Sequence, residues 1–244
     1  MANVDIHAPF EMTDPTLVEG LPGAGLVGKI AADHLVEQFD MEWVGSCFCD
    51  GVPSVAVYHP NSAETMPPVR IYADEAHDLL VLQSDVPVSP TRASSFTDCV
   101  VSWLESEGVF PVYLSGLPGE KDGVPNLYGI GTGDGAVRLE TAGIEAPREA
   151  GLVSGPTGAL IHATAERGAD SVGLIVETEA QFPDPESARA VLKHGIEPLT
   201  GIEVDTSELV DRAEEIRSAR ERLAEQVQDG GDDSTEATSI KGFQ

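Results

Sequence analysis

The chain has 244 residues, of which 41% are hydrophobic, enough for one large or two modest domains with a buried core. It carries 42 acidic against 14 basic residues, a formal net charge of −28. Because binding to a nucleic-acid backbone requires a basic surface, this balance argues against a nucleic-acid partner.

The acidic residues are spread along the whole chain, and few of the basic residues are lysines. A surface of this kind repels itself and becomes tolerable where salt screens the charges, since the Debye length falls to about 3 Å at 1 M. We therefore expect a protein of a salt-accumulating organism. The lysines are Lys29, Lys121, Lys193 and Lys241.

The cysteines and the N-terminal sequence bear on the compartment. Cys47, Cys49 and Cys99 are too few for a disulfide framework, so we expect all three to be packing residues. The N-terminal sequence lacks the basic and apolar stretches of a signal peptide, and no apolar run approaches about 18 residues. The sequence therefore predicts a cytoplasmic location and no membrane partner.

Apolar runs of strand-like composition alternate with amphipathic segments along the chain. This order predicts an α/β domain with a mixed sheet flanked by helices and with interspersed hairpins, one joining 42–49 to 54–58 and one joining 127–130 to 136–139. The predicted strands are 16–18, 42–49, 54–58, 69–73, 79–82, 109–114, 127–130, 136–139 and 171–177. The predicted helices run from the glycine-rich turn to residue 38, from about 90 to 108, from 158 to 167, and from a cap at 184 to about 192.

Beyond residue 201 the composition changes. Ser207 can cap an amphipathic helix that runs to about residue 228. Residues 229–239 contain no large apolar side chain and are predicted to be disordered. We therefore divide the chain into an α/β domain at 1–204, a C-terminal helix at 205–228 and a flexible acidic tail at 229–244.

The most informative stretch is the glycine-rich turn that follows the first predicted strand. Gly23, Gly25 and Gly28 match the dinucleotide-binding pattern G-x-G-x-x-G, and Asp50 follows where a ribose-binding acid is expected. Glu19 opposes this interpretation, because it places negative charge beside the site of a pyrophosphate. A nucleotide bound at this turn would therefore have its pyrophosphate beside the negative charge of Glu19.

The same turn fits two other patterns. Gly23, Gly28 and Lys29 match most of a P-loop, but Ile30 stands where a hydroxyl ligand for magnesium belongs. Alternatively, the glycines form a tight strand-to-helix turn that lets neighbouring segments approach closely. We favour this last interpretation; the alternative is a nucleotide- or phosphate-binding α/β enzyme. In that alternative enzyme, the cofactor-binding residues would be Gly23, Gly25, Gly28, Lys29 and Asp50.

Motifs for catalysis or metal binding are missing from the sequence. It contains neither the nucleophile pattern G-x-S-x-G nor the zinc-binding pattern H-E-x-x-H, and its histidines are dispersed. We therefore predict no catalytic residue, no metal site and no cofactor.

Four blocks of the sequence, taken in order, resemble the PAC2 family, the archaeal relatives of proteasome assembly chaperones. The resemblance extends from about residue 18 to 209 and implies a single phosphorylase/hydrolase-like α/β domain, homo-oligomerisation and no established catalysis. The blocks are Gly20–Ala32, Leu114–Pro118, Gly155–Leu160 and Glu177–Ala188.

The resemblance also implies a partner. Members of this family act in assembly of the 20S proteasome, with C-terminal segments that reach pockets on the α-ring. Their docking signal is a hydrophobic residue, a tyrosine and any residue, where this chain has Gly242, Phe243 and Gln244. Phe243 keeps the ring without the hydroxyl, and Ile240 offers a further apolar side chain. The implied partners are proteasome α-subunits, bound through Ile240, Phe243 and Gln244.

The charge balance makes the first testable prediction. Thermal melting of the full chain should occur at a higher temperature as KCl is raised from 0.1 M to 2 M, because salt screens the repulsion among the acidic side chains. Circular dichroism at each salt concentration measures the midpoint. A midpoint that does not rise would contradict a salt-adapted surface.

Overall fold

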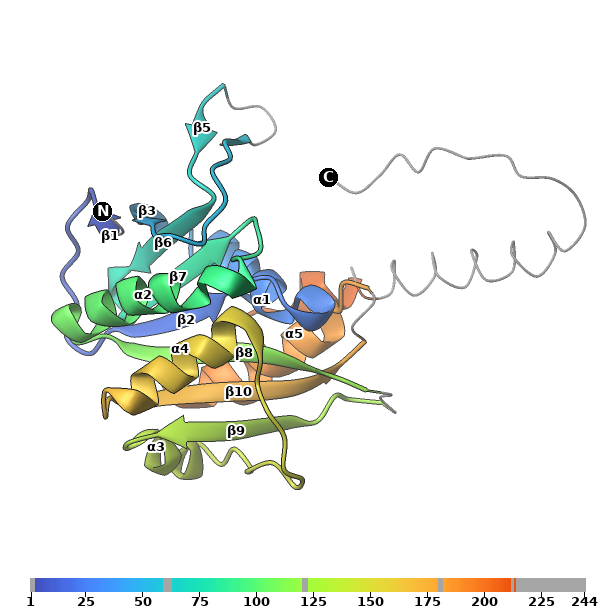
Figure 1. Cartoon of the computed structure of the whole chain (residues 1–244). Helices are drawn as coiled ribbons and strands as arrows, with labels where there is room; N and C mark the ends of the chain where they lie inside the picture. Colours follow the sequence, from blue (N-terminus) through green and yellow to red (C-terminus); the bar gives the residue numbers. More distant parts are fainter. Residues whose placement is uncertain (1–2, 59–62, 120–122, 180–181, 212, 214–244) are drawn as a thin grey trace, which may run out of the picture.

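The computed structural model describes residues 3–58, 63–119, 123–179, 182–211 and 213. Within this part of the chain, eight strands form one mixed sheet (Figure 1). Their spatial order is β1 (Asn3–Ile6), β3 (Glu42–Phe48), β6 (Val69–Asp74), β7 (Leu79–Ser84), β2 (Thr16–Gly20), β8 (Phe110–Pro118), β10 (Ser171–Thr178) and β9 (Leu127–Thr132). The central strands β7, β2, β8 and β10 are parallel, and the outer strands pair antiparallel.

Helices cover both faces of the sheet. On one face lie α1 (Val27–Gln38), α3 (Gly135–Thr141), α5 (Pro185–Val191), a π-helical turn (Leu192–Ile196) and α6 (Glu197–Thr200). On the other lie α2 (Ala93–Glu107) and α4 (Gly155–Glu166), which pack against each other in front of the strands in Figure 1. Short 3₁₀ turns cover Ala24–Leu26, Glu75–His77 and Pro90–Arg92.

The core has two halves, one on each side of the sheet. Strand β7 shows the division, because Leu79 and Val81 join the half under α1 and α5, whereas Leu80 and Leu82 join the half under α2 and α4. All of its residues are buried, as expected for a central parallel strand with both faces covered. The continuous apolar run in the sequence is therefore the mark of a central strand.

Most predicted elements are present, but two hairpin predictions are wrong. Residues 42–49 and 54–58 do not pair; β3 is already paired on both sides, by β1 and β6. Instead β4 (Val57–Tyr58) pairs with β5 (Thr65–Met66) in a separate hairpin that projects from the body (Figure 1).

The second error concerns residues 136–139, which belong to helix α3 rather than to a strand. Strand periodicity would place Val137 and Leu139 on one face, yet Leu139 is buried in the core and Val137 is exposed. The strand β1 and the helical conformation of this segment were both missed because their apolar signal is weak. Both depend on packing against segments that are distant in the sequence.

The expectation that all three cysteines only pack is also wrong. Cys49 and Cys99 form a disulfide, whereas Cys47 is a buried free thiol. The disulfide joins the end of β3 to α2 across 50 positions of sequence. Cysteine spacing does not determine such a pairing, because topology alone brings the two segments together.

The segment after α6 runs back along α1. Gln38 donates to the carbonyl of Glu203, and the His34 ring bonds the carbonyl of Asp205, one turn closer to the start of α1. The predicted C-terminal helix begins at Ser207, and Leu209 is buried in the main core. Its remainder up to residue 228 and the predicted tail lie outside the described residues. Among the helices that the structure describes, none has the length and apolar character needed to span a bilayer.

Candidate functional site

The four sequence blocks meet at one place, the carboxyl ends of the parallel strands β2, β8 and β10. The glycine-rich turn follows β2, the second block ends β8, the third opens α4, and the fourth ends β10 and opens α5. In open α/β sheets this edge is where ligands bind most often. It is therefore the candidate functional site.

Glu19 lies at the centre of this edge. Its carboxylate is fully buried and accepts hydrogen bonds from the backbone N–H of Leu21 at 2.9 Å and of Leu114 at 3.1 Å. The Thr157 hydroxyl donates to both carboxylate oxygens, at 3.2 and 3.3 Å. One side chain thus connects the glycine-rich turn, strand β8 and the first turn of α4.

Burial changes the acidity of this group. Desolvation raises the pKa of Glu19 from 4.5 to about 7, and the three hydrogen bonds oppose that rise because they favour the ionised form. The N–H groups of Leu21 and Leu114 and the Thr157 hydroxyl are donors of the kind that bind an anion, but they already donate to Glu19. A phosphate beside it would add a second negative charge in a poorly solvated place.

The glycines of the turn differ in backbone conformation and in the space available for a side chain. Gly25 has a φ of +63°, and a Cβ there would lie 2.1 Å from the Thr178 hydroxyl oxygen. A Cβ on Gly28 would lie 3.2 Å from the Leu21 carbonyl oxygen. Gly23 has a φ of −140° and open space around it. Gly25 therefore allows close contact with β10, whereas nothing in its surroundings requires glycine at position 23.

Asp184 holds the turn from the other side. Its backbone N–H donates to the Gly25 carbonyl at 2.8 Å, and its carboxylate accepts from the N–H of Ser187, which caps α5 as predicted. The same carboxylate accepts from the hydroxyls of Thr178 and Ser187, at 2.9 and 2.8 Å. The fourth block is thus bonded directly to the first.

The remaining two residues of the nucleotide alternative, Lys29 and Asp50, are placed differently. Lys29 bonds Asp33 at 2.9 Å and Asp85 at 3.2 Å. Asp50 follows β3, which β6 and β7 separate from β2. At about 4.8 Å per strand, that displacement is about 14 Å. Among the five glycine-turn candidates, Asp50 therefore lies apart, and the Lys29 side chain is engaged by two carboxylates.

A cleft of about 790 Å³ opens beside the turn on the α4 side of the sheet. Its floor is formed by the ends of β8, β10 and β9, and its roof by residues 147–156, part of the connection that crosses β10 and β9 before entering α4 (Figure 1). Leu21, Pro22, Gly23 and Ala24 close one end. The roof and floor come from segments far apart in the sequence.

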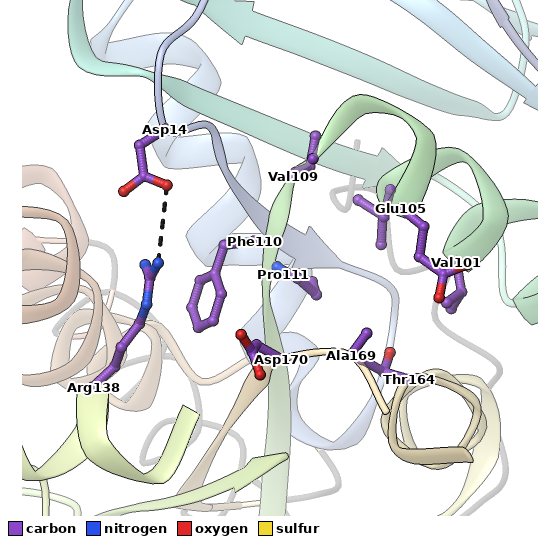
Figure 2. Close-up of a pocket in the computed structure, with 12 residues that line it drawn as sticks. Asp14, Val101, Glu105, Val109, Phe110, Pro111, Arg138, Thr164, Ala169 and Asp170 are labelled. Atoms are coloured by element: carbon purple, nitrogen blue, oxygen red, sulfur yellow. Dashed lines mark ion pairs between the residues drawn. The ribbon is translucent and has the colours of Figure 1, made fainter. Parts of the chain in front are cut away.

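A smaller pocket of about 210 Å³ lies at the opposite, amino edge of the sheet. Figure 2 shows Arg138 pointing toward Asp14, 3.9 Å away, with its guanidinium over the ring of Phe110 at 3.9 Å. Asp170 lines the pocket too, but its carboxylate accepts from the N–H of Asp134. These contacts tie α3 to the sheet and engage these charged side chains with one another or with the backbone.

Sequence reasoning found the turn but missed its central residues. From the sequence, Glu19 stands only as an obstacle to a cofactor, and no pattern groups Thr157, Thr178 and Asp184 with it. The available signal was an acid ending an apolar strand. The predicted partner-binding residues Ile240, Phe243 and Gln244 lie outside the described residues. Within the described ranges, no three His, Cys, Asp or Glu side chains are arranged to hold a metal ion.

Comparison with known proteins identifies the family. The PAC2 family model matches residues 17–224, and the chain belongs to this family. An uncharacterised protein of Methanocaldococcus jannaschii is 27% identical over 221 residues, covering 90% of this chain and 89% of that protein. Proteasome assembly chaperone 2 of Danio rerio is 28% identical over 105 residues, covering 41% of this chain and 40% of that protein.

Solved structures share the fold. Pyrococcus furiosus PbaA, described as an archaeal homolog of proteasome-assembly chaperone, has a TM-score of 0.77 and 26% identity, covering 93% of this chain and 98% of that one. Pyrococcus furiosus PbaB, described as an archaeal proteasome activator, has a TM-score of 0.78 at 23% identity, covering 91% and 98%. The mixed sheet flanked by helices is therefore the fold of this family.

Gly25 and Gly23 provide a matched pair of substitutions. Gly25→Ala should lower the free energy of unfolding by at least about 2 kcal/mol, because the left-handed backbone and the contact with Thr178 both oppose a side chain. Gly23→Ala should change it by no more than about 0.5 kcal/mol. Urea unfolding in molar KCl measures both. Equal effects would contradict the roles given to the two glycines.

The buried carboxylate predicts a pH dependence. Because the pKa of Glu19 is higher in the folded chain, the folded state binds this proton more tightly, and its stability falls as pH rises from 4.5 to 7. The slope reaches at most about 1.4 kcal/mol per pH unit. Glu19→Gln should lack this component of the slope. Urea unfolding of both proteins across this range measures it, and parallel profiles would refute the prediction.

Proposed function

We propose that this protein is a homo-oligomeric, non-enzymatic factor that binds 20S proteasome α-subunits as an assembly chaperone. The observation that carries the proposal is the similarity to PbaA along 93% of the chain. The zebrafish relative named as a proteasome assembly chaperone supports the same role. Glu19, beside the glycine-rich turn, weighs against a phosphate-dependent enzyme.

Binding through the C-terminus is physically consistent with this role. Residues 229–239 would act as a polar leash, and the entropy cost of closing such a loop grows only logarithmically with its length. Several tails on one oligomer would raise one another's effective concentration, so weak terminal contacts would add up to tight binding. Ile240, Phe243 and Gln244 are the proposed contact residues.

The projecting hairpin supports self-association. A two-stranded hairpin alone is marginally stable in water, and β4 and β5 pair with each other outside the main sheet. Val55 and Tyr58 on this arm and Phe48 at its base are exposed. The described arm residues, 52–58 and 63–68, include one charged residue, Glu64, so copies with a charge of −28 could meet there with little repulsion.

Binding to purified α-subunits tests the proposal. The full chain, immobilised in molar KCl, should retain α-subunits of the same organism. Deleting 240–244 should weaken binding at least tenfold, and so should Phe243→Ser, since burying a large apolar side chain contributes about 1.5–3 kcal/mol. Lys241→Ser, in a tail of equal length, is the control and should bind as the parent chain does.

The outcomes separate the two parts of the proposal. No retention by the intact chain would overturn the α-subunit partner. Retention that is unchanged by the deletion would overturn the role of the tail and leave the partner intact. Light scattering of the same samples measures the number of subunits, and a monomer would contradict homo-oligomerisation.

A further inference from the structure

We propose that the cleft between the sheet and residues 147–156 binds an uncharged small molecule that has an apolar body and a few hydrogen-bonding groups. This inference goes beyond the proposed partner and does not depend on it. It rests on the floor, the hydroxyl groups and the charges of the cleft.

The floor of the cleft is apolar and lies on the central strands β8 and β10 and the edge strand β9. Ile175 of β10 and Ile130 and Tyr128 of β9 are half-buried, and Leu117 of β8 is exposed. On the same face of β8, Tyr113 is completely buried, and its hydroxyl bonds Thr164 of α4. The helices thus cover the amino half of this face and leave apolar side chains uncovered at the carboxyl half.

Hydroxyl groups surround this apolar surface. Ser115, Tyr128 and Ser154 line the cleft, and their hydroxyls make no hydrogen bond to any residue in the described part of the chain. Ser154 precedes α4, and Thr157 in the first turn of that helix is already bonded to Glu19. A ligand carbonyl, hydroxyl or amide could therefore bond three available groups without displacing an existing interaction.

The charges disfavour an anionic ligand. The cationic side chain lining the cleft is Arg148, which is 71% exposed and bonded to Glu145 at 3.3 Å. Glu149 and Glu177 also line the cleft, and the buried Glu19 lies behind its inner end. Among the described residues, a phosphate or carboxylate would therefore meet excess negative charge and no positively charged group within the apolar part of the cleft.

A cationic ligand is not favoured either. Glu177 is directed toward Asn126, whose N–H and side-chain amide both donate to it, and Glu149 is exposed on the roof. Apart from Glu177, whose carboxylate is engaged by Asn126, the described residues of the floor carry no carboxylate able to neutralise a charge transferred from water. A volume of about 790 Å³ lies within the range of small-molecule sites. The ligand is accordingly uncharged and of drug-like size.

Two dyes with one ring system test the charge preference. N-phenyl-1-naphthylamine is uncharged, whereas anilinonaphthalene sulfonate adds a sulfonate to the same rings, and both fluoresce more strongly in apolar sites. Titrated into the full chain in molar KCl, the uncharged dye should bind at least tenfold more tightly. Absence of saturable binding of the uncharged dye, or equal affinity for the two, would overturn the proposal.

Substitutions locate the binding site. Gly23→Trp should weaken binding of the uncharged dye at least tenfold, since position 23 lines the cleft and has open space for a side chain. Glu107→Trp, exposed at the end of α2, is the control and should leave affinity unchanged. Thermal melting checks that each variant is folded. Unchanged affinity in a folded Gly23→Trp protein would refute the location.

A second variant covers the case in which tryptophan at position 23 prevents folding. Leu152 is 85% exposed on the roof, so Leu152→Asp should not disturb the core. It adds negative charge and removes apolar surface at the cleft, and it should weaken binding of the uncharged dye several-fold. Unchanged affinity in this variant, too, would count against the proposal.

Discussion

The carboxylate of Glu19 is the interaction on which the arrangement of this edge depends. A buried carboxylate is costly unless donors surround it, and here the donors come from the turn after β2, from β8 and from α4. Three segments separated by many residues must therefore lie in fixed positions around one group. Its raised pKa shows that the hydrogen bonds offset desolvation only in part, so the site retains a pH-dependent cost.

Close backbone contact completes the same arrangement. Gly25 lies against Thr178, and Asp184 bonds both the Gly25 carbonyl and the first turn of α5. The glycine-rich turn is thus enclosed by β10 and α5 on one side and by Glu19 on the other. The cleft on the α4 side remains open, and there the apolar floor favours an uncharged ligand while the acidic groups disfavour an anion.

The proposed functions use different parts of the molecule. The cleft lies on the α4 side of the carboxyl edge, and the proposed self-contact lies on the projecting hairpin. The segment at 203–209 runs along α1 toward its first turn, so the described part of the chain ends near the same edge as the cleft. The chain has 31 residues beyond position 213, and the proposed contact residues lie at their end.

The sequence by itself determined the elements whose signals are local. The apolar run 79–82, the amphipathic pattern of α2 and the cap at Asp184 identify their elements because periodicity and capping act within a few residues. The family resemblance also rested on short blocks, and it located the turn. Tertiary structure decided what depends on distant partners: the pairing of β3, the helical form of 136–139, the Cys49–Cys99 disulfide and the role of Glu19. Those outcomes depend on contacts between segments far apart in the chain, and no local pattern encodes which donors a buried carboxylate will meet.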